Sequence, residues 1–490
     1  MKLPYVVSSN TREAYATSSL MKESLGETSR RVRAEDFEWE EAVTPPPLSY
    51  LAVVALSQMF ERLNPLDSIL QKDRDLLMDL YPDSIPLKFS VPLIEDEHYW
   101  KRCLNSKFPT QKELGITFYK GRYLSMCLQE HLENANPDVF VEDDALELIT
   151  LVSPHIYELK LRQLRMVRQP RPPPLTDEVV DRCPWSVPAV HHHIPLELVL
   201  NHLHNLKELT LVFGVNNLEE NYEPRLFELS IADCESLCIG LENLQYFRAL
   251  RINRSNLDCS KVKVILQRLV KKESIEELDF NHCKIGDHGM KALGGFISLH
   301  NNIKVVRIAN NRFGAVGARG LAYALQMKPA APIELIDLSL NQLCLESACA
   351  LAAALVRCRE KPQALLLNAC GLEGASAEKI VGLLGLNRGL TRLDLAANDL
   401  SGAEETLLDA LDQNRRLLKM DLRSTGVSEE TEQKVCELLD RNRRLIGQET
   451  EPSEEIPPLY LNQPEYLVWE YHPDNPDHIP GRYPPRVPEV

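Results

Sequence analysis

The chain has 490 residues, and 71 Asp and Glu outnumber 55 Lys and Arg to give a net charge of −16. No basic run is long enough to follow a phosphate backbone, no apolar run approaches the roughly 20 residues of a membrane helix, and the first residues lack a signal peptide's apolar core. Because the 12 Cys include no C-x-x-C pair, reduced thiols are favoured over disulfides or zinc, and we expect an intracellular protein that contacts neither nucleic acid nor membrane.

Residues 1–47 are predicted to form an extended lead-in. The polar residues up to about position 35 show no periodic apolar face, which is typical of disordered segments. The next segment, AEDFEWEEAVTPPPLS, places Phe37 and Trp39 among acidic residues before three prolines that exclude a helix. These aromatics are candidates for docking on a partner or for folding back on their own domain.

Residues 48–150 are predicted to form a small all-helical domain. An apolar stripe with helical spacing comprises Leu48, Leu51, Val54, Ala55, Met59 and Leu63. A second helix is expected from Asp67 to Leu80, and a later helical stretch, YKGRYLSMCLQEHLEN, ends near Asn134. We interpret the aromatic residues of this region as core and not as a ligand site; they are Tyr99, Trp100, Phe108, Tyr119 and Tyr123.

Residues 151–445 are predicted to form a repeat solenoid of the α/β class. The stretch LTRLDLAANDL, from Leu390 to Leu400, fits the leucine-rich-repeat template L-x-x-L-x-L-x-x-N-x-L at every specified position. The same pattern begins at Phe247, Ile275, Ile303, Ile333, Pro362, Leu390 and Leu417, at intervals of 28, 28, 30, 29, 28 and 27 residues. Leu395 is expected in the core, and Asn398 is expected to hydrogen-bond backbone groups of the neighbouring coil.

The ends and insertions of this solenoid are atypical. IYELKLRQL, beginning at Ile156, is predicted to be a capping first strand, because an open solenoid would otherwise expose its apolar end. Helical patterns after each later strand indicate the ribonuclease-inhibitor type of repeat, in which Cys283 and Cys370 take the place of Asn398. Three histidines, His191 to His193, lie in a proline-rich insertion without a nearby ligand set, so we expect no metal site.

The sequence contains no catalytic or phosphate-binding motif in a plausible context, so we expect neither an enzyme nor a cofactor. The concave face of the solenoid is the polar array whose geometry can be predicted. A central column on this face contains the partner-binding candidates Asp279, Arg307, Asp337, Asp394 and Asp421. Its four carboxylates suit a basic partner, and the alternative is that they are only solvated.

Two further segments are candidates for protein contacts. The stretch KLRQLRMVRQPR, which includes Arg162 and Arg165, has no acidic residue and complements an acidic surface such as tubulin or a coiled-coil neighbour, unless nearby carboxylates balance it. Residues 446–490 form a proline- and aromatic-rich tail in which Trp469 and Tyr471 lie two residues apart. An extended tail presents both to one side, either as docking anchors or as a cap on the last repeat.

Several strings outside the generic repeat carry a resemblance to a known family. They are AEDFEWEEAVTPPPLS, EDEHYWKRC, ITFYKGRYLSMCLQEHLEN, LTLVFGVNNLEENYEPRLFELSIADCESL and RINRSNLDCSKVKVILQRLVKKESIEELDF. Together they resemble the family of leucine-rich-repeat subunit five of the nexin-dynein regulatory complex, the T-complex-associated testis-expressed protein one family. The resemblance implies a non-enzymatic scaffold in the axoneme of motile cilia and flagella, linking doublet microtubules. The implied partners are other subunits of that complex, with inner-arm dynein or tubulin as further candidates.

Two other classes of protein share parts of this organisation. A small helical domain ahead of leucine-rich repeats is similar to an F-box substrate receptor of a ubiquitin ligase, although no L-P-x-E type opening precedes Leu48. A GTPase-activating repeat protein would need a catalytic arginine in an early repeat, for which Arg251 and Arg254 are candidates. The proteins that co-purify with the chain distinguish the three classes.

Overall fold

The structure is a computed structural model that describes residues 46–58, 69–109, 118–140, 142–167, 191–216, 224–327, 333–358 and 361–449. Most of the predicted lead-in and nearly all of the predicted tail, with Trp469 and Tyr471, lie outside the described residues. The chain divides into two compact units after Tyr123. The predicted domain limits at 47, 150 and 445 stay predictions.

The first unit contains short helices around an aromatic core. Its helices are α3 (Leu48–Ser57), α4 (Gln71–Leu80), α5 (Leu87–Leu93), α6 (Glu97–Lys107) and the first turn of α7 (Tyr119–Asn134). Asp96 begins α6 by accepting a hydrogen bond from the Tyr99 amide at 2.9 Å. Trp100 is fully buried, and its indole nitrogen donates to the Ile94 carbonyl at 3.0 Å. Trp100 can lie in the core because its polar nitrogen has this hydrogen-bond partner while its ring packs against aromatic neighbours.

Helix α3 corrects one expectation from the sequence. The predicted apolar stripe is not buried at its start, because Leu48 is 82% exposed and Leu51 is also exposed. Only Val53 and Ser57 are buried on this helix. The sequence LSYLAVVALS is apolar on nearly every side, so helical spacing alone cannot say which side packs. The remaining stripe residues Met59 and Leu63 lie outside the described residues.

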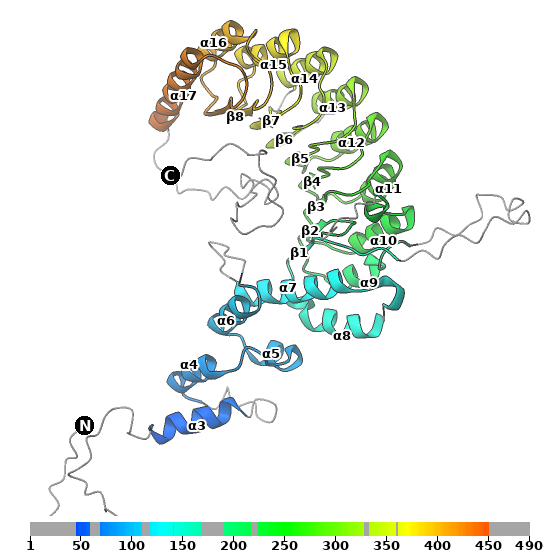
Figure 1. Cartoon of the computed structure of the whole chain (residues 1–490), viewed down its shortest axis with the longest axis vertical. Coiled ribbons are helices and arrows are strands. Elements are labelled where there is room, and N and C mark those ends of the chain that lie inside the picture. Colours follow the sequence, from blue (N-terminus) through cyan, green and yellow to red (C-terminus); the bar gives the residue numbers. More distant parts are fainter. Residues whose placement is uncertain are drawn as a thin grey trace, which may run out of the picture. The chain divides into compact units, whose positions relative to one another are not determined.

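The second unit is a solenoid with one parallel sheet. The strands are β1 (Glu158–Leu161), β2 (Glu208–Leu211), β3 (Ala249–Ile252), β4 (Glu277–Asp279), β5 (Val305–Arg307), β6 (Leu335–Asp337), β7 (Ala364–Leu366), β8 (Arg392–Asp394) and β9 (Lys419–Asp421). They pair in sequence order from β1 to β9. Figure 1 shows the strands along the inner, concave side of this unit and the helices along its outer side. The predicted α/β solenoid with convex helices is therefore confirmed.

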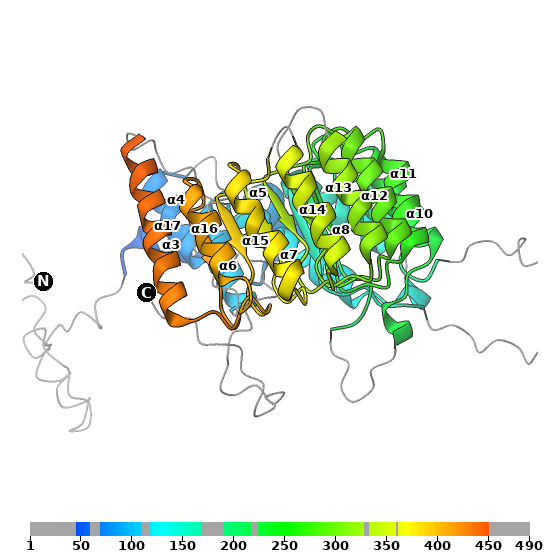
Figure 2. The same ribbon diagram turned by 90° about the horizontal axis from the view of Figure 1, so that it is seen from above.

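One helix follows almost every strand of the repeat. The helices of this unit, after the later turns of α7, are α8 (Glu142–Val152), α9 (Leu196–Leu200), α10 (Ile231–Glu242), α11 (Cys259–Leu269), α12 (Asp287–Leu299), α13 (Ala315–Met327), α14 (Leu345–Arg357), α15 (Gly374–Leu386), α16 (Glu404–Gln413) and α17 (Glu429–Glu449). Figure 2 shows α10 to α17 side by side in one layer. Across the described ranges, no helix is both long and apolar enough to span a bilayer.

A buried polar side chain ties each turn to its neighbours. Asn398 donates to the carbonyls of Leu367 and Leu395 at 2.8 and 2.7 Å, and its side-chain oxygen accepts the amides of Cys370 and Leu372. Asn311 and Asn341 make the same kind of bonds in earlier repeats. Cys283 and Cys370 occupy equivalent positions and donate weakly to the Ile252 and Leu338 carbonyls. The predicted role of Asn398 is confirmed.

The turn after each strand from β3 to β9 forces a left-handed backbone on the residue before this buried position. The residues with positive φ are Arg254, His282, Asn310, Leu340, Ala369, Ala397 and Ser424, with φ between 50° and 59°. None is glycine, and Leu340 and Ala397 have no side-chain group that compensates for the conformation. The hydrogen bonds of the Asn and Cys side chains recur at the same place in the repeats. Together they hold a left-handed backbone conformation that each residue alone would disfavour.

The last helix closes the C-terminal end of the solenoid. Asn442 donates to the carbonyls of Asn414 and Leu417 at 3.1 and 3.0 Å, and Arg443 donates to the Leu418 carbonyl at 3.0 Å. These carbonyls have no further repeat to bond, so the side chains of α17 satisfy them instead. Within the described residues, α17 therefore acts as a polar cap.

Leu395 tests the register of the repeat. It is fully buried, so Leu395→Asp should lower the free energy of unfolding by at least about 3 kcal/mol, because an unpaired charge enters the core. The control is Leu386→Asp at an exposed position of α15, which should cost less than about 1 kcal/mol. Chemical denaturation followed by circular dichroism measures both. Equal stability of the two variants would contradict the register.

Candidate protein-binding surface on the concave face

The central positions of the strands form one continuous row on the concave face. The parallel pairing aligns Arg251 with Asp279, and each next central residue with the one before it. We call this the central row; from β3 to β9 it contains Arg251, Asp279, Arg307, Asp337, Leu366, Asp394 and Asp421. The five central residues proposed from the sequence as partner-binding candidates therefore lie in this one row, with Leu366 of β7 between Asp337 and Asp394.

A buried carboxylate beside the central row holds two of its arginines. Glu277 accepts two hydrogen bonds from Arg251, at 2.9 and 2.8 Å, and a third from Arg307. Arg251 also donates to Glu208 at 2.8 Å. Burial alone would raise the pKa of Glu277, but the two guanidinium groups hold it below its usual value. This two-sided arginine clamp keeps Glu277 charged inside the sheet face.

The two aspartates in the middle of the central row are buried and bonded to their own turns. Asp279 and Asp337 each accept a hydrogen bond, at 3.0 Å, from the amide two residues later in the chain. Burial raises the pKa of Asp279 to about 7, although Arg307 opposes the change. The pKa of Asp337 is also raised by its burial. Neither carboxylate is therefore presented openly to a partner as the sequence had suggested.

The last residue of the central row, Asp421, is more accessible than the other aspartates of the row, including Asp394, which is buried. Asp394 is bonded by Arg392, whose terminal nitrogen lies 2.6 Å from a carboxylate oxygen. Asp421 forms the same kind of pair with Arg423, at 2.5 Å, and both of these side chains contact solvent. Arg423 holds the pKa of Asp421 below its usual range despite partial burial, which acts to raise it. This end presents charges of both signs.

Charge pairing within the chain redefines what the central row can do. Its carboxylates are not an open acidic column, because Arg392 and Arg423 pair with Asp394 and Asp421, and Asp279 and Asp337 are buried. Glu277 is not among the candidates predicted from the sequence. The sequence does contain a signal for the ion pair of Glu277 with Arg251. Glu277 lies 26 residues after Arg251, which is two fewer than the repeat length of 28. That offset brings their side chains together on one face of neighbouring strands.

The histidine segment has a structural role. The ring nitrogen Nδ1 of His193 lies 3.1 Å from Asp233, and the backbone amides of His192 and His193 donate to the other oxygen of that carboxylate. Asp233 also completes a capping box with Ser230 at the start of α10. Among the described residues, no group of three His, Cys, Asp or Glu side chains is placed to hold a metal ion.

The basic stretch begins at β1, the first strand of the solenoid. Lys160 pairs with Glu158 at 3.1 Å, whereas Arg162 and Arg165 have exposed side chains. The backbone amide of Arg162 donates to Glu133 on α7 at 2.6 Å, which fixes the chain at this point. The residues of this stretch from position 168 onward lie outside the described residues.

Comparison with known proteins gives the chain relatives of two kinds. It is 28% identical to a mouse protein named Dynein regulatory complex subunit 5 over 270 residues, which are 54% of this chain and 53% of that protein. The protein of that name from Chlamydomonas reinhardtii is 27% identical over 219 residues, or 44% of this chain and 50% of the algal protein. Pig ribonuclease inhibitor is 28% identical over 229 residues, 46% and 47% of the two chains.

These similarities confirm the predicted resemblance and the ribonuclease-inhibitor type of repeat. The chain spans about half the length of the curated relatives it matches. No protein-family model matches the chain.

Asp279 predicts a pH-dependent stability. Its folded-state pKa of about 7 lies above the ordinary value of 3.8, so between these values the folded chain binds more protons than the unfolded chain. The free energy of unfolding should therefore fall as pH rises through that window. Asparagine at this position keeps the acceptor oxygen but cannot ionise. The free energy of unfolding of Asp279→Asn, measured relative to that of the wild type, should therefore increase by on the order of 1–3 kcal/mol from pH 5 to pH 8.

The control for this measurement is Asp421→Asn, because the lowered pKa of Asp421 leaves it ionised throughout that range. Urea denaturation at pH 5 and pH 8 gives the free energies for all three proteins. If the free energy of unfolding of Asp279→Asn depends on pH in the same way as that of the wild type, the buried carboxylate of Asp279 does not cause the pH dependence.

Proposed function

We propose that the chain is a non-enzymatic scaffold subunit of a dynein regulatory complex in the axoneme of motile cilia and flagella. In this proposal it helps link doublet microtubules and regulate inner-arm dynein through protein–protein contacts. The single observation that carries it is the similarity to proteins named Dynein regulatory complex subunit 5 from a mammal and an alga. Its partners would be other subunits of the complex, with inner-arm dynein or tubulin as further candidates.

The geometry of the repeat supports a scaffold role. A parallel sheet of nine strands offers a long concave face on which each repeat contributes side chains at fixed spacing. The central row alternates Arg251, Asp279, Arg307 and Asp337 along four strands. Because Asp279 and Asp337 are buried, the pre-paired charges that suit the selection of a partner by complementary charge order are Arg392 with Asp394 and Arg423 with Asp421.

The accessible end of the central row is the best contact candidate on this face. Asp421 and Arg423 are held to each other at 2.5 Å, yet Arg423 remains exposed. A partner with the opposite order of charges can bond both side chains without separating them, so little conformational entropy is lost on binding. Asp394 would position Arg392 beside them.

The basic stretch is proposed as a second contact. Arg162 and Arg165 are exposed at the first strand of the solenoid, in a chain whose net charge is −16. Local positive charge of this kind favours an acidic surface, such as that of tubulin or a coiled-coil neighbour.

The alternative, a substrate receptor of a ubiquitin ligase, is favoured by one observation: α3 exposes Leu48 and Leu51 ahead of the repeats, as a helix that binds an adaptor would.

Co-purification tests the proposal against its alternative. The tagged chain, expressed in ciliated cells that lack the endogenous protein, should fractionate with axonemes and recover other dynein regulatory complex subunits after salt extraction. A matched chain with Leu48→Glu and Leu51→Glu should recover the same subunits. Recovery of a cullin adaptor that this double variant abolishes would instead establish the ubiquitin-ligase alternative.

Charge reversal tests the second contact. Arg162→Glu with Arg165→Glu should release the chain from axonemes at lower salt than wild type, because screened charge pairs weaken first. The expected loss of affinity is about tenfold, equivalent to two exposed ion pairs of about 0.7 kcal/mol each. The charge-matched control carries Lys379→Glu and Arg388→Glu, both at exposed positions near α15. An unchanged extraction profile for the first variant would remove Arg162 and Arg165 from the interface.

A further inference from the structure

The convex face carries a row of positive charge that the chain leaves largely unneutralised. Lys263 on α11, Lys291 on α12 and Arg319 on α13 are exposed and follow one another at intervals of 28 residues. Each is the fifth residue of its helix, so the three occupy the same place in consecutive repeats. We call them the cationic row.

The helices beneath this row contain almost no negative charge. Neither α11 nor α13 includes an Asp or Glu, and the single acid of α12 is Asp287. Its carboxylate already accepts the amides of Gly314 and Gly317 at 2.8 and 2.7 Å. By contrast, α16 and α17 begin with clusters of glutamate. The three cations thus lie on helices that together contain a single acidic residue.

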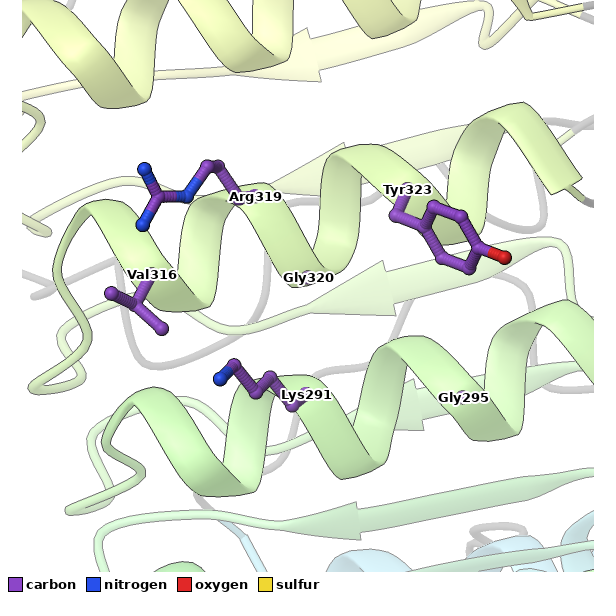
Figure 3. Close-up of a pocket in the computed structure, with 6 residues that line it drawn as sticks. All are labelled: Lys291, Gly295, Val316, Arg319, Gly320 and Tyr323. Atoms are coloured by element: carbon purple, nitrogen blue, oxygen red, sulfur yellow. The ribbon is translucent and has the colours of Figure 1, made fainter.

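A groove lies between two members of the cationic row. Helices α12 and α13 approach closely because Gly294 faces the Gly320 carbonyl, where a Cβ atom would lie only 2.7 Å from the oxygen. On the outer side this leaves a groove of about 400 Å³. It is lined by Lys291, Gly295, Val316, Arg319, Gly320 and Tyr323. Figure 3 shows Lys291 and Arg319 toward one end of this groove and Tyr323 toward the other.

Large apolar side chains accompany the row on the same helix faces. Tyr323 and Met327 follow Arg319 by four and eight residues and are 61% and 55% exposed. Leu299 follows Lys291 by eight residues and is 70% exposed. Because residues four apart on a helix share a face, Arg319 and Lys291 are aligned with apolar groups along their own helices. The surface is therefore amphipathic, with a positive edge and an apolar floor.

We propose that this convex surface binds an acidic amphipathic α-helix of a partner protein, lying across α11, α12 and α13. Packed helices are about 8–10 Å apart, and seven residues of a helix span about 10.5 Å. Carboxylates repeated every seventh residue would therefore meet Lys263, Lys291 and Arg319 in turn. Apolar residues of the same partner helix would occupy the groove against Tyr323.

Existing contacts leave the row available. Arg319 pairs with Glu346 on α14, but both side chains remain more than half exposed, so the guanidinium keeps donors for a second carboxylate. Gly295 has no atom within 4 Å of where its Cβ would be. A partner helix can therefore approach the backbone of α12 at this point. The proposed partner helix rests on the scaffold function proposed above and adds to it the chemistry of one partner.

Binding of a synthetic helix to the purified full chain tests the inference. The probe is a fluorescent, helix-forming peptide with glutamate at every seventh position and leucine on the adjacent positions, and fluorescence anisotropy measures its affinity. Lys291→Glu with Arg319→Glu should weaken binding at least about tenfold, as expected for reversal of two charge contacts. The charge-matched control, Lys379→Glu with Arg388→Glu, should bind as the wild type does.

A second peptide of the same composition, with glutamates at every fifth position, tests the spacing and should bind at least about tenfold more weakly. Thermal melting shows whether each variant is folded, and Tyr323→Ser replaces the double reversal if that variant is not. Equal binding of the two peptides, or of wild type and variant, overturns the inference. Self-association of the wild type that the double reversal abolishes, without peptide binding, assigns the surface to a second copy and also overturns it. Axonemal recovery is measured separately, so neither result depends on the other.

Discussion

The buried asparagine and cysteine positions determine the geometry of the whole solenoid. Asn398 links its own turn to the preceding coil through three of its five side-chain hydrogen bonds, and Cys370 and Asn341 occupy equivalent positions in the repeats before it. Unpaired backbone groups in such a core would be costly. Every coil therefore keeps nearly the same path, and side chains at one repeat position line up from coil to coil. Both polar surfaces of the solenoid follow from this alignment.

The two faces use aligned charges in opposite ways. On the concave face, opposite charges fall within reach, so Glu277 is shared by Arg251 and Arg307 and little net charge remains in the middle of the sheet. On the convex face, charges of one sign are aligned, and Arg319 keeps more than half of its side chain exposed although it pairs with Glu346. A face whose charges are paired within the chain selects a partner by the geometry of those charges. A face with an excess of one sign attracts a partner of the opposite charge. The chain can thus distinguish two partners with one repeat architecture.

The sequence by itself determined the repeat, its period and its core. Intervals of 27 to 30 residues predicted every strand from β3 to β9, and Leu395 and Asn398 have the burial and the bonds expected of them. Periodicity succeeds there because each repeat solves the same packing problem as its neighbours. It failed for Leu48 and Leu51, since a helix that is apolar all round does not say which side packs.

Only the tertiary structure decided which charges are satisfied. Asp279 and Asp421 occupy the same position in the repeat pattern, yet the pKa of one is raised by burial and that of the other is lowered by Arg423. Asp279 is buried on β4, between two neighbouring strands, whereas Asp421 on the last strand keeps contact with solvent and pairs with Arg423 two residues later. The groove beside Lys291 likewise depends on the close approach of two helices. Repeat spacing sets where a side chain lies, but the free energy of its charge depends on neighbours that only folding brings together.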